Sequence, residues 1–331
     1  MNRRRFLTTT ATALALASTT FTNAREIGLV EGLVSNVFGY FPDNPGLDGF
    51  AFPVTSGTVG MIQREVWPEN PDMYWDPEGE DYESMLGFHP KQMQLGAGQE
   101  GASLWFMDPQ LFDREMTRQT LESNGWQIID DDLLLLYYAG SEDDRSNLAA
   151  SLNLLGNRMR DGEWDWIALA HEGSLVMGSD GERVKAIADR LVNGTSGSSI
   201  GDRVEPLKPL IRTDTYLISI LPPERLPMES VEVSFVSRSW TGDLPIIHSI
   251  GMQLGTGEQV EQLVESVQAR LTSETSTQLR TTYADFLELS NIQRNSGSVR
   301  FDFVSTTDRW DVFDALEVDD LGMLPLIDNV R

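Results

Sequence analysis

The stretch that decides the fold runs from Ser103 to Asp180, and its first half reads SLWFMDPQLFDREMTRQTLESNGWQIIDDDLLLLYYAG (103–140). Apolar residues recur every three to four positions from Leu111 to Leu121, which predicts a helix. We expect Asp108-Pro109 to open this helix and Asn124-Gly125 to end it. Short apolar runs around it predict strands, at 103–107, 126–129 and 133–138.

The last two of these strands form a predicted hairpin, which a second helix should follow. A second hairpin is expected from 166–170 and 175–177, around His171-Glu172-Gly173. The resulting order β-α-β-β-α-β over 103–180 is that of a ferredoxin-like unit. We therefore predict an α+β fold of mainly antiparallel sheets with helices on one face. Many unrelated functions share this scaffold, so it carries no functional prediction by itself.

The rest of the chain predicts a second, smaller α+β half. Pro206 and Pro209 mark the boundary, so the domains are expected at 25–205 and 211–331. The clearest helix is 258–271, in which valine and leucine fall on one face and glutamate on the other. A further helix is predicted at 277–289. Strands are predicted at 215–221, 231–237, 246–254 and 299–304.

The N-terminus carries the most specific motif in the chain. Arg3 and Arg4 stand in the run Asn2-Arg3-Arg4-Arg5-Phe6-Leu7, which an uncharged stretch and the small residue Ala24 follow. This arrangement resembles a twin-arginine (Tat) signal peptide, here residues 1–24. The resemblance implies a secreted protein, with the Tat translocase as its partner during export and Arg3 and Arg4 as the residues read. The alternative is an arginine-rich N-terminus on a cytoplasmic protein.

The composition is strongly acidic, with 51 acidic and 25 basic residues and a formal net charge of −26. Cysteine is absent, so a lipid-anchored N-terminal cysteine is excluded. Lysine is scarce among the basic residues. In these respects the chain resembles exported proteins of salt-adapted (halophilic) archaea, whose acidic surfaces stay hydrated in concentrated salt. The alternative is an acidic secreted protein with no salt requirement. We expect no nucleic-acid partner, which would need a basic face, and no transmembrane segment in the mature protein.

The segment Trp67–Glu83 combines aromatic residues, prolines and acids, which predicts a long acidic loop. Asp76, Glu78 and Glu80 are candidate Ca²⁺ ligands, because hard cations prefer carboxylate oxygens. Trp75 beside them is a candidate ligand contact. The alternative is a solvated acidic surface whose tryptophans pack inward.

Other motifs are weaker. His89, His171 and His248 each stand alone, and His248 in an apolar strand reads as a core residue rather than a metal ligand. No cofactor motif is present, and neither a Gly-x-Ser-x-Gly elbow nor a phosphate-binding loop occurs. Asn193-Gly194-Thr195 is a candidate glycosylation site at Asn193.

Two functions remain open on the sequence. The first is a non-enzymatic exported α+β protein that binds a ligand or partner, or has a structural role, outside the membrane. The second is an extracellular hydrolase that uses carboxylate chemistry on a sugar polymer. A convergent pair of buried, pKa-shifted carboxylates in a cleft would favour the hydrolase.

Overall fold

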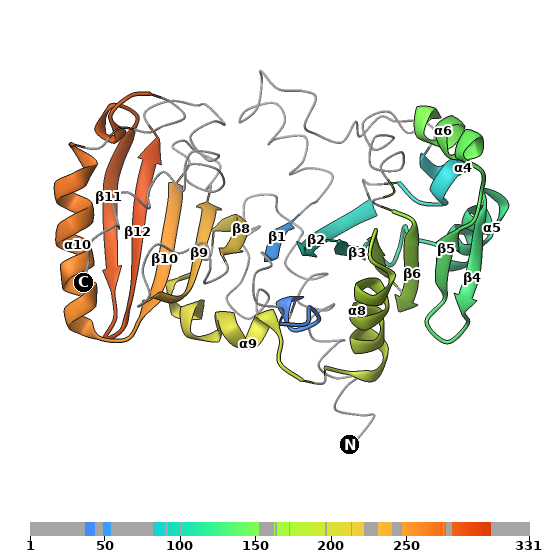
Figure 1. The fold of residues 1–331 in the computed structure, drawn as a ribbon, viewed down its shortest axis with the longest axis horizontal. Coiled ribbons are helices and arrows are strands. Elements are labelled where there is room, and N and C mark those ends of the chain that lie inside the picture. Colours follow the sequence, from blue (N-terminus) through green and yellow to red (C-terminus); the bar gives the residue numbers. More distant parts are fainter. Residues whose placement is uncertain are drawn as a thin grey trace. The chain divides into compact units, whose positions relative to one another are not determined.

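The computed structural model has an α+β fold of antiparallel sheets and helices (Figure 1), which confirms the predicted fold class. Contacts divide the described part into two compact units, of which residues 40–42 and 53–198 form the first and residues 37–39, 43–52 and 199–305 the second. The structure describes residues 37–43, 49–53, 82–89, 92–99, 101–151, 162, 164–171, 173–195, 197–212, 214–221, 231–239, 247–273, 275 and 280–305.

The sheet of the first unit has the strand order β2-β3-β7-β6-β5-β4, and neighbouring strands are antiparallel. Gly101 and Gly173, with φ of 80° and 74°, take the left-handed positions in the β2–β3 and β6–β7 turns. Both predicted hairpins are confirmed, the first as β4 paired with β5 and the second as β6 paired with β7. The strands are β2 (Met93–Gln99), β3 (Ala102–Met107), β4 (Trp126–Asp130), β5 (Leu135–Tyr138), β6 (Trp166–His171) and β7 (Ser174–Gly178).

The predicted β-α-β-β-α-β order is present as β3, α5, β4, β5, α6 and β6. Helix α5 (Arg114–Ser123) takes the chain from β3 to β4, the last strand of the sheet. From β4 the strands return in sequence order until β7 pairs with β3, with Leu104 opposite Val176. This order of elements permits a ferredoxin-like arrangement, which itself stays a prediction.

Helix α8 (Gly181–Asn193) packs on β6, β7 and β3. The Asp180 side chain caps it by accepting the backbone N–H groups of Glu182 and Arg183 at 3.1 and 3.2 Å. The helix is amphipathic, since one stripe of it is buried. That stripe contains Val184, Ile187, Ala188 and Leu191. The short helix α4 (Tyr82–Leu86) packs on α5, and α6 (Glu142–Ser151) follows β5.

Helix α5 begins later than the sequence indicates. Asp113 is its N-cap residue, whose carboxylate accepts the Met116 backbone N–H at 2.9 Å. The prediction that Asp108-Pro109 opens the helix is wrong, because the Asp108 carbonyl accepts the N–H groups of Leu111 and Phe112 in a separate turn. Two aspartates five residues apart both suit an N-cap, and tertiary packing selects the second.

We expect Asp113→Ala to lower the free energy of unfolding by about 1 kcal/mol, because the first turn of α5 loses its capping acceptor. Urea denaturation of the two proteins measures this difference. Asp131→Ala is the matched control, since it removes an exposed aspartate outside any helix. Equal effects of the two substitutions would contradict the assignment of the cap.

The sheet of the second unit has the order β11-β12-β10-β9-β8-β1, again with antiparallel neighbours. Gly251 in β10 is required by close packing, because a Cβ atom there would lie 2.1 Å from the ring of Phe235. The strands are β1 (Gly49–Pro53), β8 (Thr215–Leu221), β9 (Val231–Ser239), β10 (Ile247–Leu254), β11 (Leu287–Arg294) and β12 (Ser298–Ser305).

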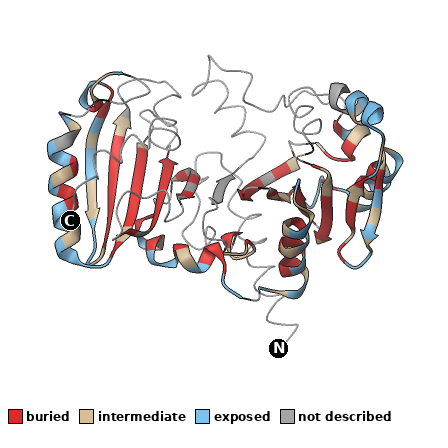
Figure 2. Cartoon of the chain, viewed as in Figure 1, coloured by how far each residue is buried: buried red, intermediate tan, exposed pale blue. Residues whose placement is uncertain are grey.

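Helix α10 (Gly257–Leu271) covers one face of this sheet and buries its apolar stripe against β10 and β12, which are almost entirely buried (Figure 2). The other face receives α9 (Ile200–Val204) and the 3₁₀ helix η4 (Glu205–Leu210), which contact β9, β10 and β12. The stripe of α10 contains Val260, Leu263, Val264 and Val267, as the sequence predicts.

The prediction of a helix at 277–289 is wrong. The 3₁₀ helix η6 (Tyr283–Asp285) is followed by β11, which pairs with β12 from Leu287 to Arg294. Leu287, Leu289 and Ile292 pack against the core on the α10 side of the sheet. Pairing with β12 and burial of these side chains favour a strand where the sequence predicted the last turn of a helix.

The predicted boundary at residues 206–210 is displaced. The two units divide between Ser198 and Ser199, so residues 199–205, which the sequence assigned to the first domain, belong to the second. Leu207 and Leu210 of η4 are fully buried, and η4 packs on β10 and β12. The prolines that suggested a linker instead lie in a 3₁₀ helix packed on the second sheet.

Candidate functional site

Strand β12 presents a different chemistry on each of its faces. Val299, Phe301 and Phe303 point to the α10 side and are buried in the apolar core. Arg300 and Asp302 alternate with them and therefore point to the side covered by η4. Their side chains are also buried, at 7% and 1% exposed, so the strand carries an ion pair where most buried strands carry apolar residues.

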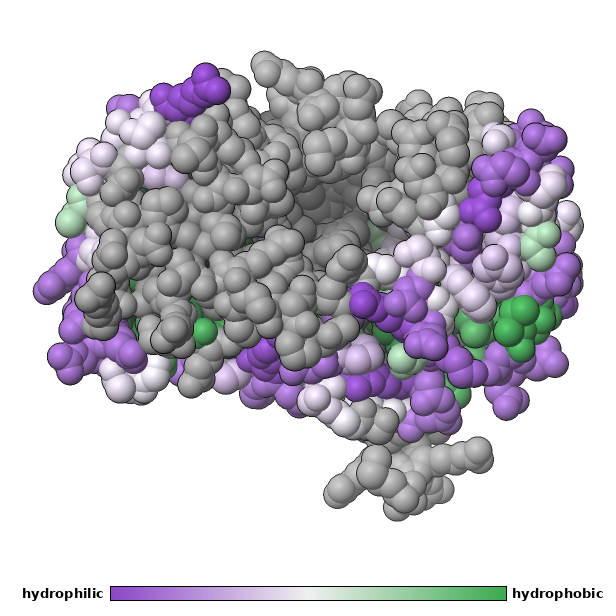
Figure 3. Space-filling view, in the orientation of Figure 1, coloured by the Kyte–Doolittle hydropathy of each residue, from purple (hydrophilic) through white to green (hydrophobic). Residues whose placement is uncertain are grey.

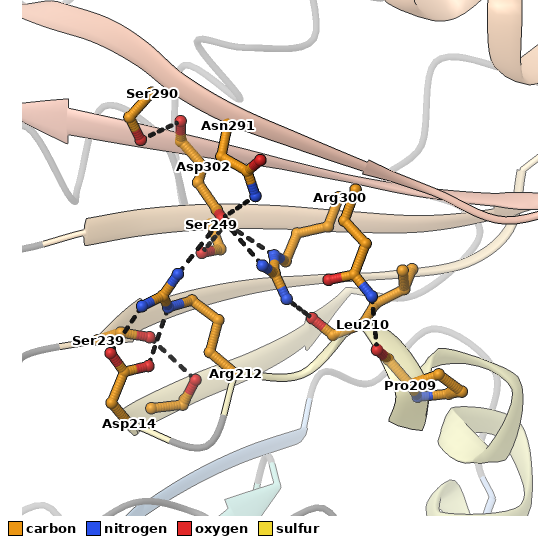
Figure 4. A network of polar contacts seen from close by, with 12 residues as sticks. Pro209, Leu210, Arg212, Asp214, Ser239, Ser249, Ser290, Asn291, Arg300 and Asp302 are labelled. Atoms are coloured by element: carbon orange, nitrogen blue, oxygen red, sulfur yellow. Dashed lines mark hydrogen bonds and ion pairs between the residues drawn. The ribbon is translucent and has the colours of Figure 1, made fainter.

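Asp302 accepts hydrogen bonds on both carboxylate oxygens (Figure 4). Arg300 donates to it twice, from Nε to Oδ1 at 2.7 Å and from Nη2 to Oδ2 at 2.9 Å. Ser249 Oγ donates to Oδ1 at 2.7 Å, and Asn291 Nδ2 donates to Oδ2 at 3.0 Å. Arg212 Nη1 lies 3.4 Å from Oδ2. The carboxylate therefore has a donor in each of the directions from which its lone pairs can be approached.

The same network ties η4 to the sheet. Arg300 Nη1 donates to the Leu210 carbonyl at 2.6 Å, and Gln293 Nε2 donates to the Pro209 carbonyl at 3.0 Å. These carbonyls belong to the last turn of η4, where acceptors have no partner within the helix. Arg300 of β12 and Gln293 of β11 thus satisfy the carbonyl groups at the end of η4 and fix its position on the sheet.

Arg212, just after η4, extends the network to the start of β8. Its guanidinium donates from Nε and Nη2 to both oxygens of Asp214, at 2.8 and 2.7 Å. This bidentate pair orients the remaining nitrogen, Nη1, toward Asp302 (Figure 4). Next to Asp214, the hydroxyl groups of Thr215 and Ser239 bond at 3.0 Å across β8 and β9.

The electrostatics of the site keep Asp302 ionised. Burial raises the pKa of Asp302, but hydrogen bonds from Arg300, Asn291 and Ser249 outweigh that effect. The net pKa lies below the ordinary aspartate value. A general acid needs the opposite displacement, and a general base needs a free lone pair facing its substrate. The arrangement is therefore that of a structural ion pair.

This pKa shift predicts a pH dependence of stability. The stabilisation from Asp302 should be complete above the pKa of an unfolded aspartate, about 3.9, and should be lost as the pH falls through the lower folded value. Urea denaturation at a series of pH values measures it as the difference between the wild type and Asp302→Asn. A difference that stays constant from neutral pH down to about pH 2 would contradict the depressed pKa.

The histidines do not converge. His248 is 1% exposed, and burial together with the neighbouring Arg238 guanidinium holds the pKa of His248 well below its ordinary value. It is a neutral core residue, as the sequence predicts. His89 is half-buried and packs edge-on against Tyr82 at 5.5 Å, and His171 ends β6. Within the described ranges, no group of three or more histidine, cysteine or acidic side chains could hold a metal ion.

Most of the site residues predicted from sequence lie outside the described residues. These are Arg3 and Arg4 of the signal, and Trp75, Asp76, Glu78 and Glu80 of the acidic loop. The predicted loop ends earlier than expected, since Tyr82 and Glu83 begin helix α4 and the Tyr82 side chain is fully buried. Asn193 ends α8 with an exposed side chain that donates to Asp189 Oδ1 at 2.8 Å.

The first unit has a surface pocket of about 450 Å³ between the end of α5 and the start of α6. Asn124 holds its wall, since its side-chain nitrogen donates to the carbonyls of Ser84 and Met85, both at 3.0 Å. Ser141 caps α6, since its hydroxyl accepts the Asp144 backbone N–H at 3.2 Å, and the Asp144 carboxylate in turn accepts the Ser141 N–H at 3.3 Å. The pocket is lined by Met85, Ser123, Asn124, Gly125, Gly140, Asp144 and Asn147, a set that contains no nucleophile paired with a base.

Comparison with known proteins gives a distant structural likeness. No family model and no curated protein match the chain. Crystal form III of TP0453 is similar, with a TM-score of 0.41 and 10% sequence identity over 82% of this chain and 94% of that chain. Crystal form I of TP0453 gives a TM-score of 0.37 and 11% identity over 82% of this chain and 92% of that chain.

Sequence reasoning missed the Asp302 network, although the strand at 299–304 was predicted. The signal was the alternation of Arg300 and Asp302 with Phe301 and Phe303, which places two opposite charges on one face of a strand. Nothing in the sequence indicated that η4 covers that face. Arg212 and Asp214 pair with each other two positions apart but form no recognisable motif, and the link from Arg212 to Asp302 spans 90 positions.

Proposed function

We propose that this chain is an exported, non-enzymatic α+β protein that binds a ligand or partner, or has a structural role, outside the membrane. The observation that carries the non-enzymatic part is the saturation of Asp302. This aspartate is the most deeply buried carboxylate in the network, and all of its acceptor positions face donors of the protein itself. Its lowered pKa suits an ion pair rather than proton transfer.

The hydrolase alternative requires a second feature, a pair of carboxylates whose environments push their pKa values apart. Neither Asp302 nor Asp214 belongs to such a pair, because the charged partners of both are arginines. Release of reducing ends from a polysaccharide by the purified mature protein would overturn the non-enzymatic part of the proposal.

Export is supported by the resemblance of residues 1–24 to a twin-arginine signal. None of the helices in the described ranges is long and apolar enough to cross a membrane. The absence of cysteine suits a protein that folds before export, because such folding needs no disulfide. The formal net charge of −26 supports work in concentrated salt, which screens self-repulsion over a few ångströms.

Replacing Arg3 and Arg4 together by lysine should leave the precursor inside the cell, because the paired arginines are the residues that the translocase reads. Immunoblots of the cell and medium fractions measure this. The matched control is a conservative change of another basic residue, Arg5→Lys, which leaves Arg3 and Arg4 in place. Unchanged secretion of the double variant would contradict export by this route.

A further inference from the structure

Strand β4 is the last strand of the first sheet, and among the described residues it has a neighbour on one side only. Its inner edge pairs with β5, from Trp126 opposite Tyr138 to Asp130 opposite Leu135. The backbone groups that point to the outer edge meet no strand in the described ranges. Such an edge is a template on which an extended peptide can add a further strand.

An apolar side chain stands exposed on this strand. Ile129 is 57% exposed, and among the described residues it is one of three large apolar side chains that are exposed to solvent. The register shifts between Ile128 and Asp130, which makes Ile129 the extra residue of a β-bulge. Figure 3 shows an apolar (green) patch where the β4–β5 hairpin lies in Figure 1, with hydrophilic (purple) residues around it.

The tip of the hairpin is held in place. Asp130 Oδ1 accepts the backbone N–H groups of Asp132 and Leu133 at 3.1 and 3.3 Å, and Asp130 Oδ2 pairs with Lys185 of α8. Leu134 has a φ of 44°, a left-handed conformation that costs a leucine about 1 kcal/mol or more. The hairpin is therefore a fixed feature, and its surface is available without a folding step.

The charge around the patch is negative. Asp130 is paired with Lys185, which also attracts Asp132, and the side chains of Asp131 and Asp132 are exposed in the turn that follows Ile129. Three carboxylates and one lysine leave this turn with an excess of negative charge, so an exposed apolar residue next to it favours a partner that is both apolar and basic. A second copy of this chain does not meet that description, because its own net charge is −26 and the same hairpin would repel itself.

We propose that the outer edge of β4 binds an extended, basic polypeptide segment by strand addition. Main-chain hydrogen bonds to β4 would hold the segment, an apolar side chain of the segment would cover Ile129, and its lysine or arginine residues would face Asp131 and Asp132. This inference deepens the proposed function, because it names the class of partner at one surface. The contact is short, since β4 spans only Trp126–Asp130, so it suits a transient partner.

The test uses a capped hexapeptide of alternating lysine and valine as the probe, and isothermal titration calorimetry on the mature protein. We expect saturable binding that Ile129→Lys weakens by about tenfold or more, since one buried apolar contact is lost and a like charge is gained. The same peptide with N-methyl groups on all of its backbone nitrogens should not bind, because neither of its edges can then donate main-chain hydrogen bonds to β4. Asp131→Asn with Asp132→Asn should weaken binding and reduce its salt dependence.

The matched control is Leu111→Lys. Leu111 is 59% exposed, so this change adds the same charge at the same exposure, but it lies before α5 and not on β4. We expect the dissociation constant of the peptide to stay within about twofold of the wild-type value, because this substitution changes only the overall charge. Equal weakening by both lysine variants, or undiminished binding of the N-methylated peptide, would show non-specific attraction and overturn the inference. Retained secretion and absent hydrolysis would leave the proposed function standing in that case.

Discussion

Replacing Asp302 by alanine should lower the free energy of unfolding by about 3–5 kcal/mol. The change removes the carboxylate and leaves the buried guanidinium of Arg300 without a counter-charge. It also releases Ser249, Asn291 and one nitrogen of Arg212 from their acceptor. Chemical denaturation monitored by circular dichroism measures the loss, and the cooperative transition of the second unit should move to lower denaturant.

Two further variants separate the ion pair from burial alone. Arg300→Met combined with Asp302→Leu should recover much of the lost stability, because an apolar pair needs no counter-charge in a dry environment. Asp214→Ala removes a partly exposed partner of Arg212 and should cost less than Asp302→Ala. An Asp302→Ala protein as stable as the wild type would show that the network contributes nothing to the fold.

Phe301→Ala should lower the free energy of unfolding by about 3–5 kcal/mol through the opposite face of the same strand. Phe301 is 1% exposed and stacks with Phe303 at 6.4 Å between ring centroids. Its removal leaves a cavity between β12 and α10 that the surrounding side chains fill only in part. The same denaturation experiment measures this loss.

Leu289→Ala is the control for Phe301→Ala. Leu289 lies opposite Phe303 on the edge strand β11 and is only partly buried at the rim of the same core. Its truncation should cost clearly less, because solvent can reach the space it vacates. Equal losses at the two positions would mean that the core of the second unit extends to its edge strand, contrary to the burial of these side chains.

Local sequence patterns predicted those helices and turns for which the local pattern and the tertiary packing favour the same structure. The helical spacing of α10, the turn at Gly173 and the end of α5 at Asn124 are confirmed, because each is fixed by residues a few positions apart. The hydrophobic period and the turn residues of such elements are sufficient to predict them from the local sequence. The fold class followed from them.

Features that depend on distant pairing could not be predicted in this way. The sequence predicted a helix that reached Leu289, and only the pairing of Leu287–Arg294 with β12 decides for a strand. The contact between Arg300 and Leu210 joins residues 90 positions apart, as does that between Arg212 and Asp302. An ion pair such as that between Arg212 and Asp302 has no sequence motif, because only the folded sheet brings the two residues together.

The central claim is that the buried carboxylate of Asp302 is an ionised structural clamp and not a catalytic acid or base. The most direct test is the ¹³C chemical shift of the Asp302 carboxyl carbon as a function of pH. We expect a titration midpoint below the value of about 3.9 for an ordinary aspartate, because arginine, amide and hydroxyl donors favour the charged form. A midpoint raised toward neutral pH would contradict this account and make Asp302 a candidate proton donor.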